Sequence, residues 1–313
     1  MNIDPQVAAH YAKQAPVGGT PQVLDLQVLR ANADRVYNDK AQFPPVFSAE
    51  DWSVPCPWGS IPLRLYRPNG RAGLPIMIYY HGGGFVIHNI ASHDSLCRKL
   101  CLECDCAVVS VGYRLAPEHP FPAYLEDSYT AMQWVYDNAD RLGLDHTRIS
   151  LAGDSAGAYI SAAVSLLARD RNGPKITLQI LCYGGGGILP NEDSESFQSL
   201  INNNPVLSPA FMRLVERSKG GDGYEDNPYL NPGRAKDLSG LPKTYSINSE
   251  NDPLRDDGEA FAAALRAAGN EVIMERVPGV YHGFLLLWEE FDISKKVISS
   301  IAAVVKETFS VSY

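Results

Sequence analysis

The sequence predicts an α/β fold built on one parallel-type sheet with helices on both faces. Strand-like and helix-like segments alternate along most of the 313 residues, which is the pattern of a layered α/β domain. Segments such as Leu74–Tyr80 are continuously apolar, as in strands that helices cover on both sides. Right-handed crossovers then join consecutive strands, so a single sheet is expected.

The elements follow one another in a regular order after the first 45 residues. Residues 1–45 have helical spacing, interrupted by Gly18, Gly19 and Pro21, and contain no strand pattern. Strand patterns begin at Trp52. The predicted strands are Ile61–Tyr66, Leu74–Tyr80, 106–113, Ile149–Ala152, Ile176–Cys182, Lys243–Asn248 and Glu271–Arg276. The predicted helices are 92–104, 123–140, Ala156–Ala168, Pro209–Arg217, Asp256–Ala268 and 289–308.

Two pieces of the chain lie outside this alternation. They are residues 1–45 and residues 184–240, where the strand and helix periods are lost. The second piece opens with the run Gly184–Gly187. We expect both pieces to form a lid over a domain made of residues 46–183 and 241–313.

Composition narrows the class of partner. The chain carries 27 Lys and Arg against 36 Asp and Glu, a net charge of 27 − 36 = −9, so nucleic acid and anionic membranes are unfavourable partners. No apolar run approaches the roughly 18–20 residues that span a bilayer. The first residues also lack the basic and apolar parts of a secretory signal. We therefore expect a cytoplasmic protein, with a homodimer as an open alternative.

Four of the six cysteines crowd into ten residues, at Cys97, Cys101, Cys104 and Cys106. A metal site is one interpretation, but the spacing is not that of two paired CxxC motifs. The segment also has the pattern of a helix end followed by an apolar strand. We therefore expect buried thiols without a bound metal, and no disulfides in a cytosolic setting.

The pentapeptide Gly153–Gly157 has the form G-x-S-x-G and predicts a nucleophile. It follows a predicted strand and opens a predicted helix of small residues, which is the strand–turn–helix context of a nucleophile elbow. The two glycines relieve crowding around Ser155, which such a turn holds in a strained backbone conformation. A helix N-cap serine is the alternative, but a cap needs no glycine on both sides.

The segment His81–Phe85 places three consecutive glycines directly after the strand Leu74–Tyr80. Without side chains in the way, backbone N–H groups there can point at an oxyanion. A flexible turn is the alternative interpretation, although a histidine at a strand end followed by three glycines rarely arises by chance.

A base and an orienting acid follow the nucleophile in hydrolases of this layout, in the order Ser, Asp or Glu, His. Only His282 follows Ser155 among the seven histidines, and it comes shortly after the last predicted strand. It is the predicted base, with an ordinary surface histidine as the alternative.

The predicted acid is Asp252, because it follows the strand Lys243–Asn248 at the edge where active sites of open α/β sheets gather. Asp256 and Asp257 fall at a helix start, where carboxylates cap backbone N–H groups. Glu250 is the nearest rival.

Taken together, these motifs resemble the hormone-sensitive-lipase-like bacterial esterases, also called family IV carboxylesterases, within the α/β-hydrolase fold. The likeness runs from about residue 50 to the C-terminus. The matching segments are His81–Phe85, Tyr113–Ala123, Gly153–Gly157, Asp252–Asp256 and Tyr281–Phe284. The resemblance implies a mostly parallel eight-stranded sheet forming the catalytic domain, with the lid above as its helical cap.

The resemblance also implies roles for individual residues. Ser155, Asp252 and His282 would form a catalytic triad, without a metal or organic cofactor. The N–H groups of Gly83, Gly84 and Ala156 would form the oxyanion hole. The bonds preceding Pro117 and Pro122 would be cis.

Three positions depart from the family pattern. Ala158-Tyr159 replaces the usual Gly-Asn, Gly112 replaces an Asp, and Gly184–Gly187 replaces a stretch that contains proline. We expect Tyr159 to narrow or reshape the acyl pocket, and we take Tyr159 and Val86 as candidate substrate-binding residues.

The expected activity is hydrolysis of short- to medium-chain acyl esters through an acyl-enzyme intermediate. One alternative is an amidase or esterase specialised for a natural product. Another is a ligand-binding homologue without turnover; such homologues lack the catalytic histidine, whereas His282 is present here.

Overall fold

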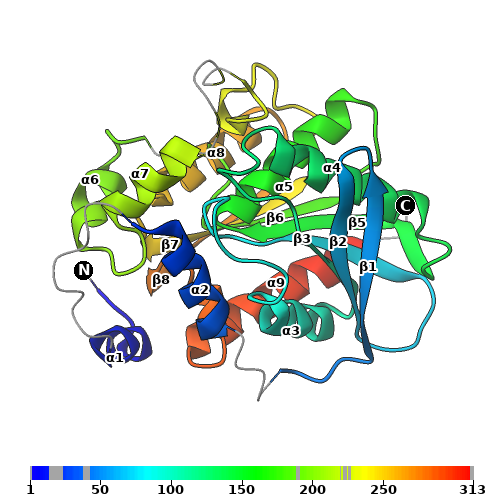
Figure 1. Ribbon diagram of the computed structural model, residues 1–313, viewed down its shortest axis with the longest axis horizontal. Coiled ribbons are helices and arrows are strands. Elements are labelled where there is room, and N and C mark those ends of the chain that lie inside the picture. The colour runs from blue at the N-terminus through cyan, green and yellow to red at the C-terminus, as the bar shows by residue number, and fades with distance from the viewer. Residues whose placement is uncertain are drawn as a thin grey trace.

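A single sheet organises the computed structural model, which describes residues 2–13, 24–37, 43–187, 191–218, 220, 224 and 227–310. Its eight strands run in the order β1-β2-β4-β3-β5-β6-β7-β8 (Figure 1). The β1–β2 and β2–β4 pairs are antiparallel, and the other pairs are parallel. The predicted fold class, a mostly parallel eight-stranded α/β sheet, is therefore confirmed.

The elements follow the predicted order with shifted ends. The strands are β1 Ser48–Cys56, β2 Gly59–Arg67, β3 Leu74–Tyr80, β4 Ala107–Val111, β5 Leu144–Asp154, β6 Leu178–Cys182, β7 Lys243–Asn251 and β8 Val272–Tyr281. The α-helices are α1 Pro5–Lys13, α2 Leu26–Tyr37, α3 Asp94–Cys104, α4 Ala123–Asp137, α5 Ala156–Asp170, α6 Glu195–Leu200, α7 Pro209–Ser218, α8 Arg255–Ala267 and α9 Asp292–Ser310. Short 3₁₀ turns occupy Ile201–Asn203, Pro232–Arg234 and Phe284–Leu287.

Two elements differ from the sequence expectation. β1 begins at Ser48, before the expected start of the strands, and is an antiparallel edge strand with a mostly exposed pattern that carries little apolar signal. The helix α6 was not predicted, because its six residues are too few to show a helical period. Residues 1, 14–23, 38–42, 188–190, 219, 221–223 and 225–226, all within the predicted lid, lie outside the described residues.

Helices cover both faces of the sheet, which explains the continuously apolar strands. In β3, Ile76, Ile78 and Tyr80 pack into one core cluster with residues of α4 and α5. Met77 and Tyr79 point the other way, into a second cluster with α3 and α9. Figure 1 shows α3 and α9 on one side of the sheet and α4 and α5 on the other. Every side chain of this strand after Pro75 is at most 2% exposed.

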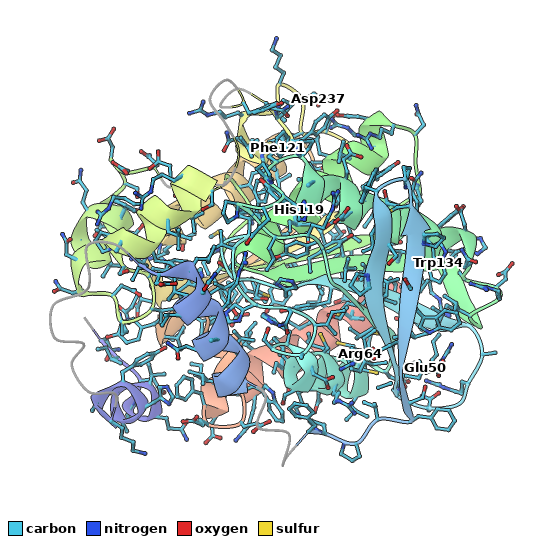
Figure 2. All side chains as sticks on the ribbon, viewed as in Figure 1. Glu50, Arg64, His119, Phe121, Trp134 and Asp237 are labelled. Carbon is cyan, nitrogen blue, oxygen red and sulfur yellow. The ribbon has the colours of Figure 1, made fainter. Side chains whose placement is uncertain are left out.

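The carboxyl ends of the parallel strands meet at one edge of the sheet, where α1, α2, α6 and α7 also gather (Figure 1). Arg64 on β2, labelled in Figure 2, reaches Asp51 on β1 at 2.6 Å and Asp94 at the start of α3 at 2.6 Å. This ion pairing ties the antiparallel edge to the helix layer. None of the described helices combines the length and apolarity needed to cross a membrane.

One arginine joins α2 to the loops at the carboxyl edge. Arg30 Nε donates to the Val86 carbonyl at 2.8 Å, and its Nη2 donates to the Ala116 carbonyl at 3.0 Å. Its guanidinium also pairs with both oxygens of Glu118, each at 2.8 Å. The Ala116–Pro117 and Phe121–Pro122 bonds in this segment are cis, as the resemblance implied.

A glycine contact between α5 and β3 generates a prediction about stability. A β-carbon at Gly157 would overlap the carbonyl oxygen of Tyr80, so no side chain fits between the helix start and the strand end. Gly157→Ala should therefore lower the free energy of unfolding by about 3 kcal/mol, measured by urea denaturation.

Ser161→Ala, one turn along the same helix, is the matched control. It removes only the hydroxyl that donates to the Gly157 carbonyl, so it should change the free energy of unfolding by no more than about 1 kcal/mol. Equal stability of the two variants would contradict the close packing of α5 against β3.

Candidate active site

The turn between β5 and α5 presents Ser155 at the carboxyl edge of the sheet. Ser155 has φ 53° and ψ −119°, a strained conformation for a residue with a side chain. Its N–H donates to the Cys182 carbonyl at 2.8 Å, which fixes the turn against β6. Ser155 occupies the N-cap position of α5, but its side chain makes no capping hydrogen bond. The hydroxyl therefore points to another partner.

That partner is His282, and the contact continues to Asp252. His282 Nε2 lies 2.8 Å from Ser155 Oγ, and His282 Nδ1 lies 2.7 Å from Asp252 Oδ2. Because an ionised carboxylate only accepts hydrogen bonds, Nδ1 carries the proton and a neutral Nε2 accepts from the serine. His282 is 4% exposed and Asp252 is fully buried. The three predicted residues are thus brought into one hydrogen-bonded line.

Strand lengths explain why these two residues meet. β7 extends to Asn251 and β8 to Tyr281, each beyond its predicted end, so Asp252 and His282 are the first residues after neighbouring parallel strands. A second bond steadies the acid, because its Oδ1 accepts the N–H of Leu254 at 2.9 Å.

The rival acids have other partners. Asp256 accepts the Ser196 N–H at 2.8 Å, and Asp257 accepts the Asn191 N–H at 3.0 Å. Glu250 accepts the Gly279 N–H at 2.8 Å. Asp256 and Asp257 thus bind the segment of residues 191–196, and Glu250 binds strand β8.

The glycine loop lies beside the serine. Gly83 and Gly84 have φ of 109° and 60°, values that glycine adopts without strain. A β-carbon on Gly83 would overlap the Ile87 carbonyl, and one on Gly84 would press against Val215 of α7. Ala156, the first residue of α5, belongs to the helix start whose N–H groups have no intrahelical acceptor. All three predicted oxyanion donors therefore lie close to Ser155 in the fold.

A cavity of about 580 Å³ opens over Ser155 and His282. Its walls are mostly apolar and come from α1, α2, α7 and the loops near residues 204–208 and 283–287, as expected for a small-molecule site. The apolar residues on the wall are Tyr11, Leu24, Leu29, Ile87, Pro205, Val206, Leu207, Phe211, Leu286 and Leu287.

Neither candidate substrate-binding residue lies on the wall of this cavity. Tyr159 is buried and its hydroxyl donates to the Tyr229 carbonyl at 2.5 Å, and Val86 is fully buried with its carbonyl bonded to Arg30. The neighbouring Ile87 and His88 reach the cavity instead. The physical reason is that Tyr159 lies one turn into α5 and packs against Phe85 beneath the loop.

The other departures from the family pattern serve close packing. The Gly112 N–H donates to the Pro62 carbonyl at 2.9 Å, where a β-carbon would crowd the proline ring. A β-carbon on Gly184 would lie 2.7 Å from the Ser155 carbonyl oxygen, and the Gly186 carbonyl accepts the Gly233 N–H at 2.7 Å.

The cysteines are free thiols, and burial raises the pKa of Cys97 well above its ordinary value. In the part of the chain that the structure describes, no three His, Cys, Asp or Glu side chains are grouped as a metal ion would require. Cys97, Cys101 and Cys104 lie on the buried face of α3 and pack, together with Cys106, against residues of α9 in the core.

The sequence reasoning missed three residues around the site. The ring of Tyr183 packs edge-on against His282, with centroids 4.9 Å apart, and Tyr183 itself has φ 44°. His88, also at positive φ, lines the cavity. His93 Nε2 lies 3.1 Å from Asp154, next to the nucleophile. No local pattern marks these contacts, because each joins different strands or loops.

Comparisons with known proteins agree with this geometry. The family pattern described as the alpha/beta hydrolase fold matches residues 77–286. The chain is 42% identical over 229 residues to carboxylesterase NlhH of Mycobacterium tuberculosis, covering 72% of this chain and 71% of that protein. It is 38% identical over 259 residues to carboxylic ester hydrolase LipN of the same organism, covering 76% of this chain and 65% of LipN.

Other relatives match along the whole chain. An arylesterase of Saccharolobus solfataricus is 34% identical over 316 residues, covering 99% of this chain and 100% of that protein. Among solved structures, a hyperthermophilic esterase from Pyrobaculum calidifontis superposes with a TM-score of 0.91 at 35% identity, covering 100% of both chains.

The buried histidines of the site generate a prediction about pH. Burial, together with the neighbouring His93, lowers the pKa of His88 to about 3. In the unfolded chain this histidine binds a proton near pH 6.5, whereas in the folded protein it stays neutral down to about pH 3. Its contribution to the free energy of unfolding is therefore fully present above pH 6.5 and is lost as the pH falls towards 3. Between pH 7.5 and pH 5, the free energy of unfolding should therefore fall by about 2 kcal/mol less in His88→Asn than in the wild type.

Urea denaturation at the two pH values measures this difference. Asparagine tolerates the positive φ of position 88. His119→Asn, at an exposed position (Figure 2), is the matched control and should follow the wild type. An unchanged pH dependence in His88→Asn would show that this imidazole is not held neutral by the fold.

Proposed function

Because the chain belongs to the alpha/beta hydrolase fold family, we propose that it is a serine carboxylesterase that hydrolyses short- to medium-chain acyl esters. The observation that carries the proposal is the hydrogen-bonded line from Ser155 through His282 to Asp252, at 2.8 Å and 2.7 Å. Relatives named as esterases and carboxylesterases support the same reaction class.

The proposed reaction proceeds in two acyl-transfer steps without a cofactor. His282 Nε2 takes the proton of Ser155 as its Oγ attacks the ester carbonyl carbon, and Asp252 stabilises the resulting imidazolium. The proton then passes to the departing alcohol, leaving an acyl group on the serine. Water, deprotonated by the same imidazole, attacks this acyl-enzyme and releases the carboxylic acid and free serine.

The N–H groups of Gly83, Gly84 and Ala156 are the proposed donors to the tetrahedral oxyanion. They belong to two backbone turns that meet beside Ser155, one after β3 and one at the start of α5. Backbone donors of this kind cost no reorganisation during the reaction, and each lowers the barrier by about 3 kcal/mol.

Residues 1–45 and 184–240 are the proposed cap over a catalytic domain of residues 46–183 and 241–313. Side chains from both pieces, such as Leu29 and Phe211, line the cavity above the serine. An apolar cavity of this limited size can enclose a short acyl chain, whereas part of a long chain would remain outside in water.

The two alternatives lead to different results. A binding homologue needs no hydrogen bond between the histidine and the serine, whereas that contact is present here at 2.8 Å. An amidase or an esterase for a natural product would use the same residues and differ in the occupant of the cavity.

Ser155→Ala tests the reaction. Hydrolysis of p-nitrophenyl butyrate by the purified protein should fall at least ~10³-fold, because the alanine has no oxygen to form the acyl-enzyme. Ser161→Ala, another buried serine on the same helix, should keep full activity. A wild-type protein that is folded and inactive on this and other simple esters would reject the esterase assignment.

A series of p-nitrophenyl esters tests the size of the cavity. We expect kcat/KM to be highest for short and medium acyl chains and to decline beyond about C10, where the chain outgrows the apolar walls. Rates compared at equal solubility that keep rising past this length would contradict the proposed limit.

A further inference from the structure

Asp154, next to the nucleophile, lies outside the proposed triad, yet its carboxylate has several hydrogen-bond partners. Asp154 is 2% exposed. Its Oδ1 accepts the Tyr79 hydroxyl at 2.8 Å and the Gly82 N–H at 3.0 Å. His93 Nε2 lies 3.1 Å from the same oxygen. One buried oxygen thus collects donors from β3, the glycine loop and the segment before α3.

Counting hydrogens assigns a charge to His93. The single proton of the Ser92 hydroxyl goes to the Asn89 carbonyl at 2.8 Å. Ser92 Oγ can therefore only accept from His93 Nδ1, 2.9 Å away. The carboxylate of Asp154 also only accepts, so Nε2 carries a hydrogen as well. His93, fully buried, is an imidazolium paired with an ionised carboxylate.

The surrounding groups agree with a buried ion pair. Burial by itself would raise the pKa of Asp154, but the charge of His93 and the hydrogen bonds from His93 and Tyr79 hold it at about 2. Burial and the nearby His93 lower the pKa of His81 to about 3, and His88 behaves in the same way. The two flanking imidazoles therefore stay neutral, and the positive charge is concentrated on His93.

The pair is joined directly to the loop that carries the proposed oxyanion donors. The Gly82 N–H donates to Asp154 Oδ1 at 3.0 Å, while His93 Nε2, 3.4 Å from the same nitrogen, carries its own hydrogen and does not accept. A β-carbon on Gly82 would overlap the other carboxylate oxygen, so only glycine allows this close approach. The hydrogen bond to Asp154 and the close packing against it together fix the position of the Gly82 peptide.

We propose that the Asp154–His93 ion pair is the positioning element of the oxyanion loop. Through Gly82 it holds the N–H groups of Gly83 and Gly84 at a set distance from the hydroxyl of Ser155. Because Asp154 and Ser155 are consecutive, one short segment places both the nucleophile and the donors. The inference rests on the proposed esterase activity, and the pair, with both side chains buried, acts through the loop.

Asp154→Asn is the first variant of the test. Asparagine keeps an oxygen for Tyr79 and Gly82 but leaves the charge of His93 uncompensated, so the loop should shift. We expect kcat on p-nitrophenyl butyrate to fall roughly 10- to 100-fold with KM changed less than about 2-fold, because oxyanion donors act mainly in the transition state. The affinity for a trifluoromethyl ketone inhibitor, which forms a tetrahedral adduct with the serine, should fall by a similar factor.

Two further variants separate charge from fold. The double variant Asp154→Asn/His93→Gln restores neutrality and should recover part of the lost kcat. Tyr79→Phe deletes one hydroxyl and leaves its ring in the core, so it keeps the test open if the others fold poorly; kcat should fall roughly 3- to 10-fold. A merely structural role predicts neither the rescue nor the selective loss of kcat.

Asp127→Asn is the matched control. Asp127 is equally buried and accepts hydrogen bonds from Trp58 and from three Arg114 N–H groups, away from the glycine loop. It should lower stability without changing kcat or inhibitor affinity. If Asp154→Asn, the double variant and Tyr79→Phe behave like this control, the positioning role is wrong. If the wild type itself hydrolyses no ester, the proposed function fails, and the inference falls with it.

Discussion

The site depends on one constraint, the absence of side chains where the start of α5 crosses the end of β3. Gly157 faces the Tyr80 carbonyl so closely that a methyl group cannot enter. This approach brings the turn that carries Ser155 against the loop that follows β3, and the positive φ of the serine is its local cost. Without that contact the nucleophile and the glycine loop would be separated by a layer of side chains, and no two backbone segments could surround one oxyanion.

Two carboxylate–histidine pairs occupy this edge of the sheet, and their surroundings give them opposite tasks. His282 lines the cavity and Asp252 is buried behind it, so that in the proposed reaction the imidazole exchanges a proton with the serine and then with water. His93 is fully buried beside the glycine loop, and Asp154, which borders the cavity but is only 2% exposed, is held by hydrogen bonds from the Tyr79 hydroxyl and the Gly82 N–H. In the two proposals, similar chemical groups therefore carry a proton in one place and form a fixed ion pair in the other.

Sequence reasoning located the parts of the site that are short and continuous. Gly153–Gly157 and His81–Phe85 each contain their own turn chemistry, so the pattern predicts the local geometry directly. Asp252 and His282 could be placed because parallel strands end at a common edge. The contact between His93 and Asp154 could not be foreseen, since it depends on how the segment before α3 packs under the loop. Tyr159 was expected in the substrate pocket because it lies close to Ser155 in the sequence, but it is buried in the core and is not on the cavity wall. Nearness in the sequence does not determine which side of a helix faces a cavity.

The contacts of Arg30 connect a wall of the cavity with the glycine loop. The same guanidinium binds α2, which contributes to the cavity wall, and the Val86 carbonyl, three residues after Gly83. It also binds the Ala116 carbonyl and the Glu118 carboxylate in the segment Tyr113–Ala123. A displacement of the α2 helix would therefore pull on the loop that follows the proposed oxyanion donors. An occupant of the cavity that contacts α2 would therefore also hold this loop through Arg30, and because coupling is reciprocal the loop would in turn hold α2.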